Sequence, residues 1–185
     1  GLYTGDSSLQ QITVSNLGTG ELVCSVNIEP TSPSGGVNNA VKFDGINDYS
    51  YIYNDEVLQL TDQFTIEAWI NFEEGGVGKP VIISKGSGIT EYEVFLDTTT
   101  NSSTIGLSLE GVGDFMSQAV LSAGQWYHIA FTYDGAAINL FINGVLDRSQ
   151  PASGLVAIST NSLYLGKRYN SSEHRYKGTV DEFRL

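Results

Sequence analysis

The stretch Gly124-Gln-Trp-Tyr-His-Ile-Ala-Phe-Thr-Tyr-Asp-Gly135 and its continuation Ala136-Ala-Ile-Asn-Leu-Phe-Ile-Asn-Gly144 decide the fold. Every second residue in each run is large and apolar, as expected for a β-strand with one buried face. Asp134-Gly135 and Asn143-Gly144 close the runs, and both dipeptides suit the left-handed backbone of tight hairpin turns. Residues 126–149 are therefore predicted to form a three-stranded antiparallel meander.

The same alternation recurs along the chain, most clearly in Phe64-Thr-Ile-Glu-Ala-Trp-Ile-Asn-Phe72. Gly, Asn, Ser and Asp separate the apolar runs at the regular spacing of a sandwich or barrel, and no segment has the caps and period of an amphipathic helix. We predict one all-β domain over residues 1–185, a two-sheet antiparallel jelly-roll sandwich. Besides those already named, the predicted strands are 22–28, 40–44, 49–53, 81–85, 92–97, 104–110, 115–120, 155–158, 163–166 and 179–185, and 29–39 is predicted to be a long loop.

Composition restricts the function. The chain has 185 residues with 9 basic and 21 acidic side chains, a formal charge of −12. Nucleic-acid binding and attraction to an anionic membrane both need clustered Lys and Arg, so neither is expected. No apolar run approaches the ~18 residues of a membrane span, and the lone Cys24 excludes an internal disulfide. We expect a domain cut from a larger extracellular or cell-surface protein, with neighbouring domains in the parent chain, of bacterial or phage type.

Several segments in order resemble one family. They are Ala40-Val-Lys-Phe-Asp-Gly-Ile-Asn-Asp-Tyr49, Phe64-Thr-Ile-Glu-Ala-Trp-Ile70, Ile83-Ser-Lys-Gly86, the 124–135 and 140–145 runs, Leu163-Tyr-Leu-Gly-Lys167 and Tyr176-Lys-Gly-Thr-Val-Asp-Glu-Phe-Arg-Leu185. Together they resemble the laminin-G-like jelly roll of the concanavalin-A-like lectin/glucanase superfamily, over about 145 residues. The resemblance implies two curved antiparallel sheets and a noncatalytic role in binding glycans or proteins. It does not name the ligand, because this fold has many functions.

A structural calcium ion is expected at Asp44 and Asp181. If the first and last strands pair, as the resemblance implies, these two carboxylates converge near one edge and form a hard-oxygen site. The alternative is that Asp44 is a turn former and Asp181 an ordinary strand end. Strand alternation also predicts that Asp181 and Glu182 lie on opposite faces.

Glycan binding is expected from aromatic rings that share a face with charged groups, because sugars stack on rings while carboxylates and guanidinium groups bond hydroxyls. One candidate set, on a concave sheet, is Glu67, Trp69, Lys85 and Tyr92. The alternative is that Trp69 packs under a covering loop and Glu67 pairs with Lys85. A second set lies in the basic loop 167–177 and comprises Arg168, Tyr169 and Arg175, for which the alternative is a solvated loop.

The favoured interpretation is thus a noncatalytic, lectin-like module that binds a polysaccharide or glycan. The alternative is a protein-interaction or adhesion domain of a bacterial adhesin or phage surface protein. Catalysis is the least favoured class. Glu91 and Glu93 would lie ~7 Å apart on one strand face, within the range of inverting glycosidases, but any i, i+2 pair has that spacing.

Overall fold

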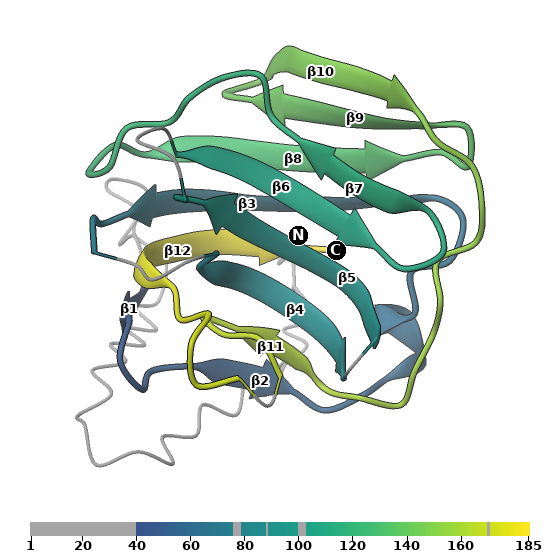
Figure 1. The fold of residues 1–185 in the computed structure, drawn as a ribbon. Coiled ribbons are helices and arrows are strands. Elements are labelled where there is room, and N and C mark those ends of the chain that lie inside the picture. Colours follow the sequence, from purple (N-terminus) through teal and green to yellow (C-terminus); the bar gives the residue numbers. More distant parts are fainter. Residues whose placement is uncertain (1–39, 76–78, 88, 100–102, 170) are drawn as a thin grey trace, which may run out of the picture.

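A computed structural model of the chain describes residues 40–75, 79–87, 89–99, 103–169 and 171–185. Two six-stranded antiparallel sheets pack face to face (Figure 1). The sheet nearer the viewer, here called the front sheet, has the order β2-β11-β4-β5-β6-β7, and the back sheet has the order β1-β12-β3-β8-β9-β10. The front strands are β2 (Ser50–Ile52), β11 (Leu163–Leu165), β4 (Val81–Ser87), β5 (Ile89–Asp97), β6 (Thr104–Leu109) and β7 (Gly113–Met116). The back strands are β1 (Val41–Asp44), β12 (Lys177–Arg184), β3 (Phe64–Phe72), β8 (Tyr127–Tyr133), β9 (Ala137–Ile142) and β10 (Val145–Pro151).

The predicted meander is confirmed as β8, β9 and β10, with Phe131 paired to Leu140 across the first hairpin. Asn143 has a φ of 51° and Gly144 a φ of 76°, as the tight turn after β9 requires. The all-β prediction is confirmed as well, and the short 3-10 turn Glu56–Leu58, capped by Asp55, lies outside it.

The strand predicted at 155–158 is wrong. This segment connects β10 in the back sheet to β11 in the front sheet, and only Val156 is buried, whereas Leu155 is 71% exposed. Its backbone makes two separate hydrogen bonds instead of a strand ladder. Val156 N donates to Thr61 O, and Ala157 N donates to Glu110 O. The predicted strand 22–28 and loop 29–39 lie outside the described residues.

The core lies between the sheets and follows from the alternation. Ile66, Ala68 and Ile70 of β3 point inward and are fully buried. Val94 and Leu96 of β5 meet them from the front sheet within the same cluster. Burial of such side chains supplies the main favourable term in folding, about 1.5–3 kcal/mol for each large one. Among the described residues, no helix is long and apolar enough to cross a bilayer.

The outer face of the front sheet carries one continuous row of polar side chains, one from each strand. Directly paired residues of neighbouring antiparallel strands point to the same face, so their pairing fixes the row. Cα pairing runs without a break through Tyr51, Tyr164, Ser84, Glu93, Ser108 and Asp114. This row positions the site described below.

Candidate functional site

Five tyrosines gather at the β2–β11 end of this row and are here called the tyrosine patch: Tyr49, Tyr51, Tyr53, Tyr164 and Tyr169. Tyr164 lies at their centre, with ring centroids 6.1 Å from Tyr49, 5.9 Å from Tyr51 and 5.6 Å from Tyr169. Tyr53 extends the patch, with its ring 5.1 Å from that of Tyr51 and its hydroxyl 3.2 Å from the Tyr51 hydroxyl. Such tilted ring contacts each add about 0.5–1.5 kcal/mol beyond area burial, so the patch is a preformed aromatic surface.

Two cations lie over the rings. The Lys167 Nζ is 3.9 Å from the Tyr49 ring centroid and 4.7 Å from that of Tyr164, and the Arg175 guanidinium carbon is 5.6 Å from the Tyr49 centroid. Neither cation forms an ion pair within the described part of the chain. Burial, and then the charge of Arg175, lower the pKa of Lys167. The patch therefore holds two positive charges that no ion pair among the described residues neutralises, in a strongly acidic protein.

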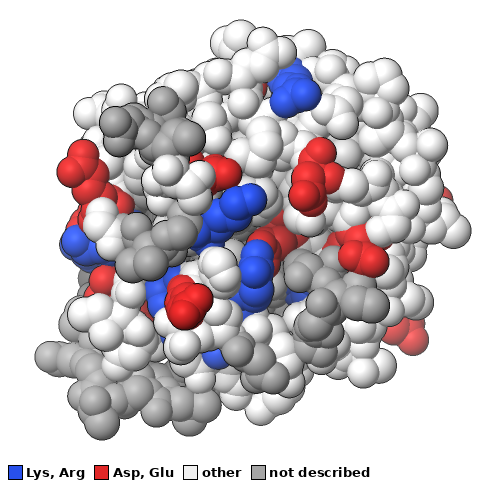
Figure 2. Space-filling view, in the orientation of Figure 1, with Lys and Arg blue, Asp and Glu red and all other residues white. Residues whose placement is uncertain are grey.

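Arg168 anchors the same loop to the front sheet. Its Nε donates to Glu93 Oε2 at 2.7 Å and its Nη2 donates to the other carboxylate oxygen, so the pair is bidentate. These hydrogen bonds raise the pKa of Arg168. The Glu93 side chain is 2% exposed and that of Arg168 is 35% exposed, so the pair is reached by solvent from the Arg168 side. Seen from the front sheet, basic and acidic side chains lie close together near the middle of this face (Figure 2).

Ser84 supplies a further polar group beside the patch. It pairs with Tyr164 on one side and with Glu93 on the other, and its side chain is fully buried. Its hydroxyl oxygen has no hydrogen-bond partner among the described residues. The row thus brings rings, a guanidinium group and an unsatisfied hydroxyl to one side of the sheet.

Tyr92 and Lys85 were predicted on this exposed face, and that placement is wrong. Tyr92 is fully buried in the core in phase with Val94, and its hydroxyl donates to Leu58 O at 3.2 Å. Burial raises the pKa of its phenol far above the ordinary value. Lys85 is paired opposite Tyr92 and is also fully buried, where its Nζ donates to both carboxylate oxygens of Glu91 at 2.9–3.0 Å.

Trp69 is exposed and Glu67 is half-buried on an outward face, but on the other side of the molecule from the patch. β3 belongs to the back sheet, so their outward face looks away from the tyrosine patch. Glu67 accepts from Arg184 Nη1 at 3.0 Å, and not from Lys85. The Trp69 ring is 38% exposed and lies 5.3 Å from the His128 ring, so it does not pack under a loop. Of the seven predicted ligand residues, only Arg168, Tyr169 and Arg175 lie together.

Asp44 and Asp181 do not meet. β1 does pair with β12, but the register places Asp44 opposite Lys177, and Asp181 lies four residues further along β12, about 13 Å away at ~3.3 Å per residue. Asp44 Oδ1 accepts from the backbone N–H groups of Ile46 and Asn47 at 2.7 and 3.1 Å, as a turn former does. No group of three metal-ligating side chains occurs among the residues that the structure describes. These two aspartates cannot share one calcium ion at this separation, and calcium binding by the domain stays a prediction.

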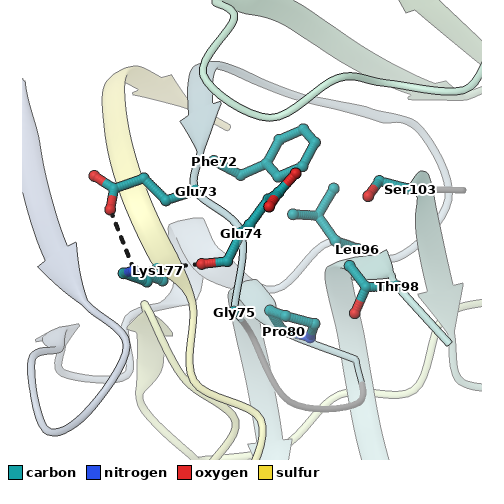
Figure 3. A pocket seen from close by; sticks show the side chains of 9 residues that line it. All are labelled: Phe72, Glu73, Glu74, Gly75, Pro80, Leu96, Thr98, Ser103 and Lys177. Carbon is teal, nitrogen blue, oxygen red and sulfur yellow. Dashed lines mark hydrogen bonds and ion pairs between the residues drawn. The ribbon is translucent and has the colours of Figure 1, made fainter. Parts of the chain in front are cut away.

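A separate hollow of about 180 Å³ lies at one end of the sandwich (Figure 3). Phe72, Pro80 and Leu96 line it, with Thr98 and Ser103 at one side and Glu73, Glu74 and Lys177 at the other. Two of its three charged side chains are already partnered, because Glu73 pairs with Lys42 at 2.9 Å and with Lys177 at 3.5 Å. Lys177 also donates to Glu74 O. The end hollow therefore offers fewer free groups to a ligand than the tyrosine patch.

Sequence reasoning missed four of the five patch tyrosines. Tyr49, Tyr51 and Tyr53 alternate along one short segment, and this spacing was a usable signal because alternate strand residues share a face. Tyr164 could not be joined to them from sequence, because the β2–β11 pairing links segments about 110 residues apart.

The comparisons with known proteins agree with this geometry. The family Laminin_G_3, described as the concanavalin A-like lectin/glucanases superfamily, matches residues 44–185. The chain belongs to this superfamily. The laminin-G-like resemblance of the sequence is thereby confirmed, together with the jelly-roll fold. No curated protein matches the chain.

Solved structures of the superfamily fold include both binding modules and enzymes. The CBM40 of a Ruminococcus gnavus IT-sialidase, bound to α2,3 sialyllactose, is 14% identical with a TM-score of 0.60, over 77% of this chain and 85% of that one. The LG1–3 region of the laminin α2 chain is 12% identical with a TM-score of 0.59, over 82% of this chain and 31% of that one. An alginate lyase from Alteromonas sp. 272 is 10% identical with a TM-score of 0.53, over 82% and 89%. At such identities the likeness shows the fold alone.

Proposed function

We propose that this domain is a noncatalytic carbohydrate-binding module of an extracellular protein, and that the tyrosine patch holds the glycan. The observation that carries the proposal is the partly exposed ring cluster around Tyr164, flanked by Lys167 and by the Arg168–Glu93 pair. Sugar rings present apolar C–H faces that stack on aromatic rings, and their hydroxyls bond charged groups in fixed directions. The patch supplies both kinds of contact on one side of the front sheet, from β2, β11 and the segments next to them.

Both carboxylates of the candidate acid–base pair are bound to cations. Glu91 and Glu93 were the candidate acid–base pair, yet Glu91 is held by Lys85 and Glu93 by Arg168, each through two hydrogen bonds. A glycosidase needs one carboxyl group that is protonated and free to donate to the leaving oxygen. Two carboxylates fixed by cations and each only 2% exposed do not meet that need, which supports a binding role.

The test is a glycan array followed by titration calorimetry on the best neutral and acidic glycans. We expect Tyr164→Ala to weaken binding at least tenfold, equivalent to ~1.4 kcal/mol, because it removes the central ring. Tyr164→Phe keeps the ring and should retain most of the affinity. Val145→Ala, on the exposed edge of the back sheet, is the control, since Val145 is 70% exposed and far from the patch.

Two outcomes would overturn the carbohydrate-binding function. No binding to any glycan, together with binding to a protein partner, would make the domain an adhesion module. Release of reducing or unsaturated sugar ends from a bound polysaccharide would make it an enzyme. Full affinity in Tyr164→Ala would move the glycan site away from the patch and leave the carbohydrate class intact.

A further inference from the structure

The back sheet carries a second hollow, on the face opposite the tyrosine patch. It is lined by Trp69, Trp126, Asp181 and Glu182, and its volume is about 270 Å³. Trp69 is 38% exposed and Trp126 is 44% exposed, so two large aromatic surfaces remain open to solvent. Exposed tryptophans that line one hollow are uncommon on a purely structural surface, because burying each would contribute favourably to stability.

Strand pairing explains how these side chains meet. Trp69 is paired with Asp181 of β12 on one side and with His128 of β8 on the other, so all three share the outer face. Trp126 precedes His128 by two residues and therefore projects to the same side. The hollow spans β12, β3 and β8, and Trp126 joins it from the position just before β8.

Glu182 joins this set through a local irregularity. In a regular strand it would point to the face opposite Asp181, as predicted from the sequence, and that prediction is wrong because both residues line the hollow. The pairing of β12 with β3 contains one extra residue between Asp181 and Arg184, and Glu182 has a φ of +47°. A β-bulge of this kind turns a side chain towards a new direction.

This arrangement has an energetic cost. Glu182 is a non-glycine residue in the left-handed region, which costs about 1–2 kcal/mol. The same conformation places the carboxylates of Asp181 and Glu182 at one hollow. The polar contacts of these carboxylates are a backbone bond from Glu182 N to Asp181 Oδ1 at 2.8 Å and an exposed pair of Glu182 with Arg184 at 3.1 Å. No basic side chain lines the hollow among the described residues.

From this chemistry we propose that the hollow is a binding site for a small organic ammonium ion. Tryptophan is the aromatic side chain that attracts cations most strongly, and carboxylates at the rim add Coulomb attraction. A methylated ammonium group suits the site because it carries charge on an apolar surface that can contact two indole rings. The proposal is independent of glycan binding, because the two surfaces lie on opposite sheets.

The chain provides its own reporter for the test. Trp69 and Trp126 are the two tryptophans of the sequence, so intrinsic tryptophan fluorescence reads this hollow and not the tyrosine patch. Tetramethylammonium chloride is titrated at constant ionic strength against sodium chloride. tert-Butyl alcohol, similar in bulk and uncharged, is the matched neutral probe. We expect a saturable change in emission with tetramethylammonium at about 1 mM and no saturable change with the alcohol.

Charge variants complete the experiment. Asp181→Asn with Glu182→Gln should raise the dissociation constant at least tenfold, whereas Glu110→Gln, at an exposed carboxylate in the turn after β6, should leave it unchanged. Trp126→Phe is a second variant, with less affinity expected and a melting temperature that shows the fold is kept. The proposal is overturned by no saturation up to about 100 mM, by an equal response to the alcohol, or by full affinity in the double variant. It is equally overturned if neutral oligosaccharides, and not the ammonium ion, change the emission.

Discussion

Arg168 donates two hydrogen bonds to the carboxylate of Glu93, and this pair anchors the 167–176 loop to the outer face of the front sheet. The two residues are 75 positions apart in the chain. Glu93 is 2% exposed, so its charge is withdrawn from water and depends on Arg168 for compensation. The pair therefore has a structural role beside any contact that it makes with a glycan.

Arg168→Ala should lower the free energy of unfolding by about 2–3 kcal/mol. Loss of one partner from a fully buried pair costs 3–5 kcal/mol, and the 35% exposure of Arg168 reduces that value. Chemical denaturation measures the loss. Lys42→Ala, which breaks the exposed pair with Glu73, should cost under about 1 kcal/mol. Equal losses in the two variants would show that the Glu93 charge does not depend on Arg168.

Lys85→Met should be more harmful than a double change at the same place. The single variant leaves Glu91 charged and buried without its partner, at a cost of about 3–5 kcal/mol. Lys85→Met combined with Glu91→Leu removes both charges and should recover most of that stability. Thermal melts of wild type, both single variants and the double variant give the coupling energy. A double variant as unstable as the sum of its parts would contradict the argument.

Much of the fold could be predicted because each main strand has an unambiguous apolar face. Ile66, Ile70, Ile129 and Phe131 lie in the core as their alternation requires. Residues 155–158 were misassigned because four apolar side chains in a row resemble a strand, although Leu155 and Ile158 are exposed in the connection. Local sequence does not reveal whether a segment has a partner strand.

The candidate site was predicted in part, for two physical reasons. Alternation gives the two faces of a strand but not the sheet to which the strand belongs, so Trp69 and Arg168 were placed together although they lie on opposite sheets. Both faces of β5 carry an aromatic residue, Tyr92 on one and Phe95 on the other. The face of Tyr92 was predicted to be exposed, but it packs in the core. The bulge at Glu182 has no sequence signature, because glutamate rarely adopts a positive φ.

Acid should change the stability of the Asp44 turn through two carboxylates whose pKa shifts have opposite sign. Burial opposes the charge of Asp44, but backbone N–H donors from Ile46, Asn47 and Asp48 outweigh it and lower its pKa. Its stabilising contribution is present above the unfolded pKa near 3.9 and is lost as the pH falls through the lower folded value. Burial, and then the charge of Asp44, raise the pKa of Asp48, so its ionisation destabilises the fold above that pKa.

Two variants separate these effects. Asp44→Ala should lower the free energy of unfolding by about 1–2 kcal/mol at pH 7, and by less at pH 3, because pH 3 lies below the unfolded pKa near 3.9 and part of the charge-dependent stabilisation is then gone. Asp48→Asn keeps an acceptor for Asp44 N and should raise stability at pH 7 but not at pH 3. Urea unfolding at the two pH values measures both. A loss from Asp48→Asn at pH 7 would reverse the assigned sign.

Removal of calcium by a chelator should leave the melting curve unchanged, because Asp44 and Asp181 cannot bind one ion together. Their separation along β12 and the turn bonds of Asp44 leave no shared site. A metal that binds the folded state alone would raise stability by about 2.7 kcal/mol at a hundredfold excess over its dissociation constant, which a thermal melt detects readily. A clear shift with calcium would reveal a site built from other residues.

Glu182→Gly should keep or raise stability while it weakens the ammonium site. Glycine adopts a φ of +47° without the penalty of about 1–2 kcal/mol that glutamate bears there, and this relief exceeds the entropy that glycine loses on folding by up to about 1 kcal/mol. The exposed pair with Arg184 that is lost contributes little. Thr179→Gly in the same strand is the control and should cost about 1 kcal/mol, because Thr179 lies in a regular part of the ladder. Denaturation of both variants, with tetramethylammonium titration of Glu182→Gly, tests whether the strain at Glu182 serves the hollow. Equal destabilisation of the two variants would show that the bulge carries no strain that glycine can relieve.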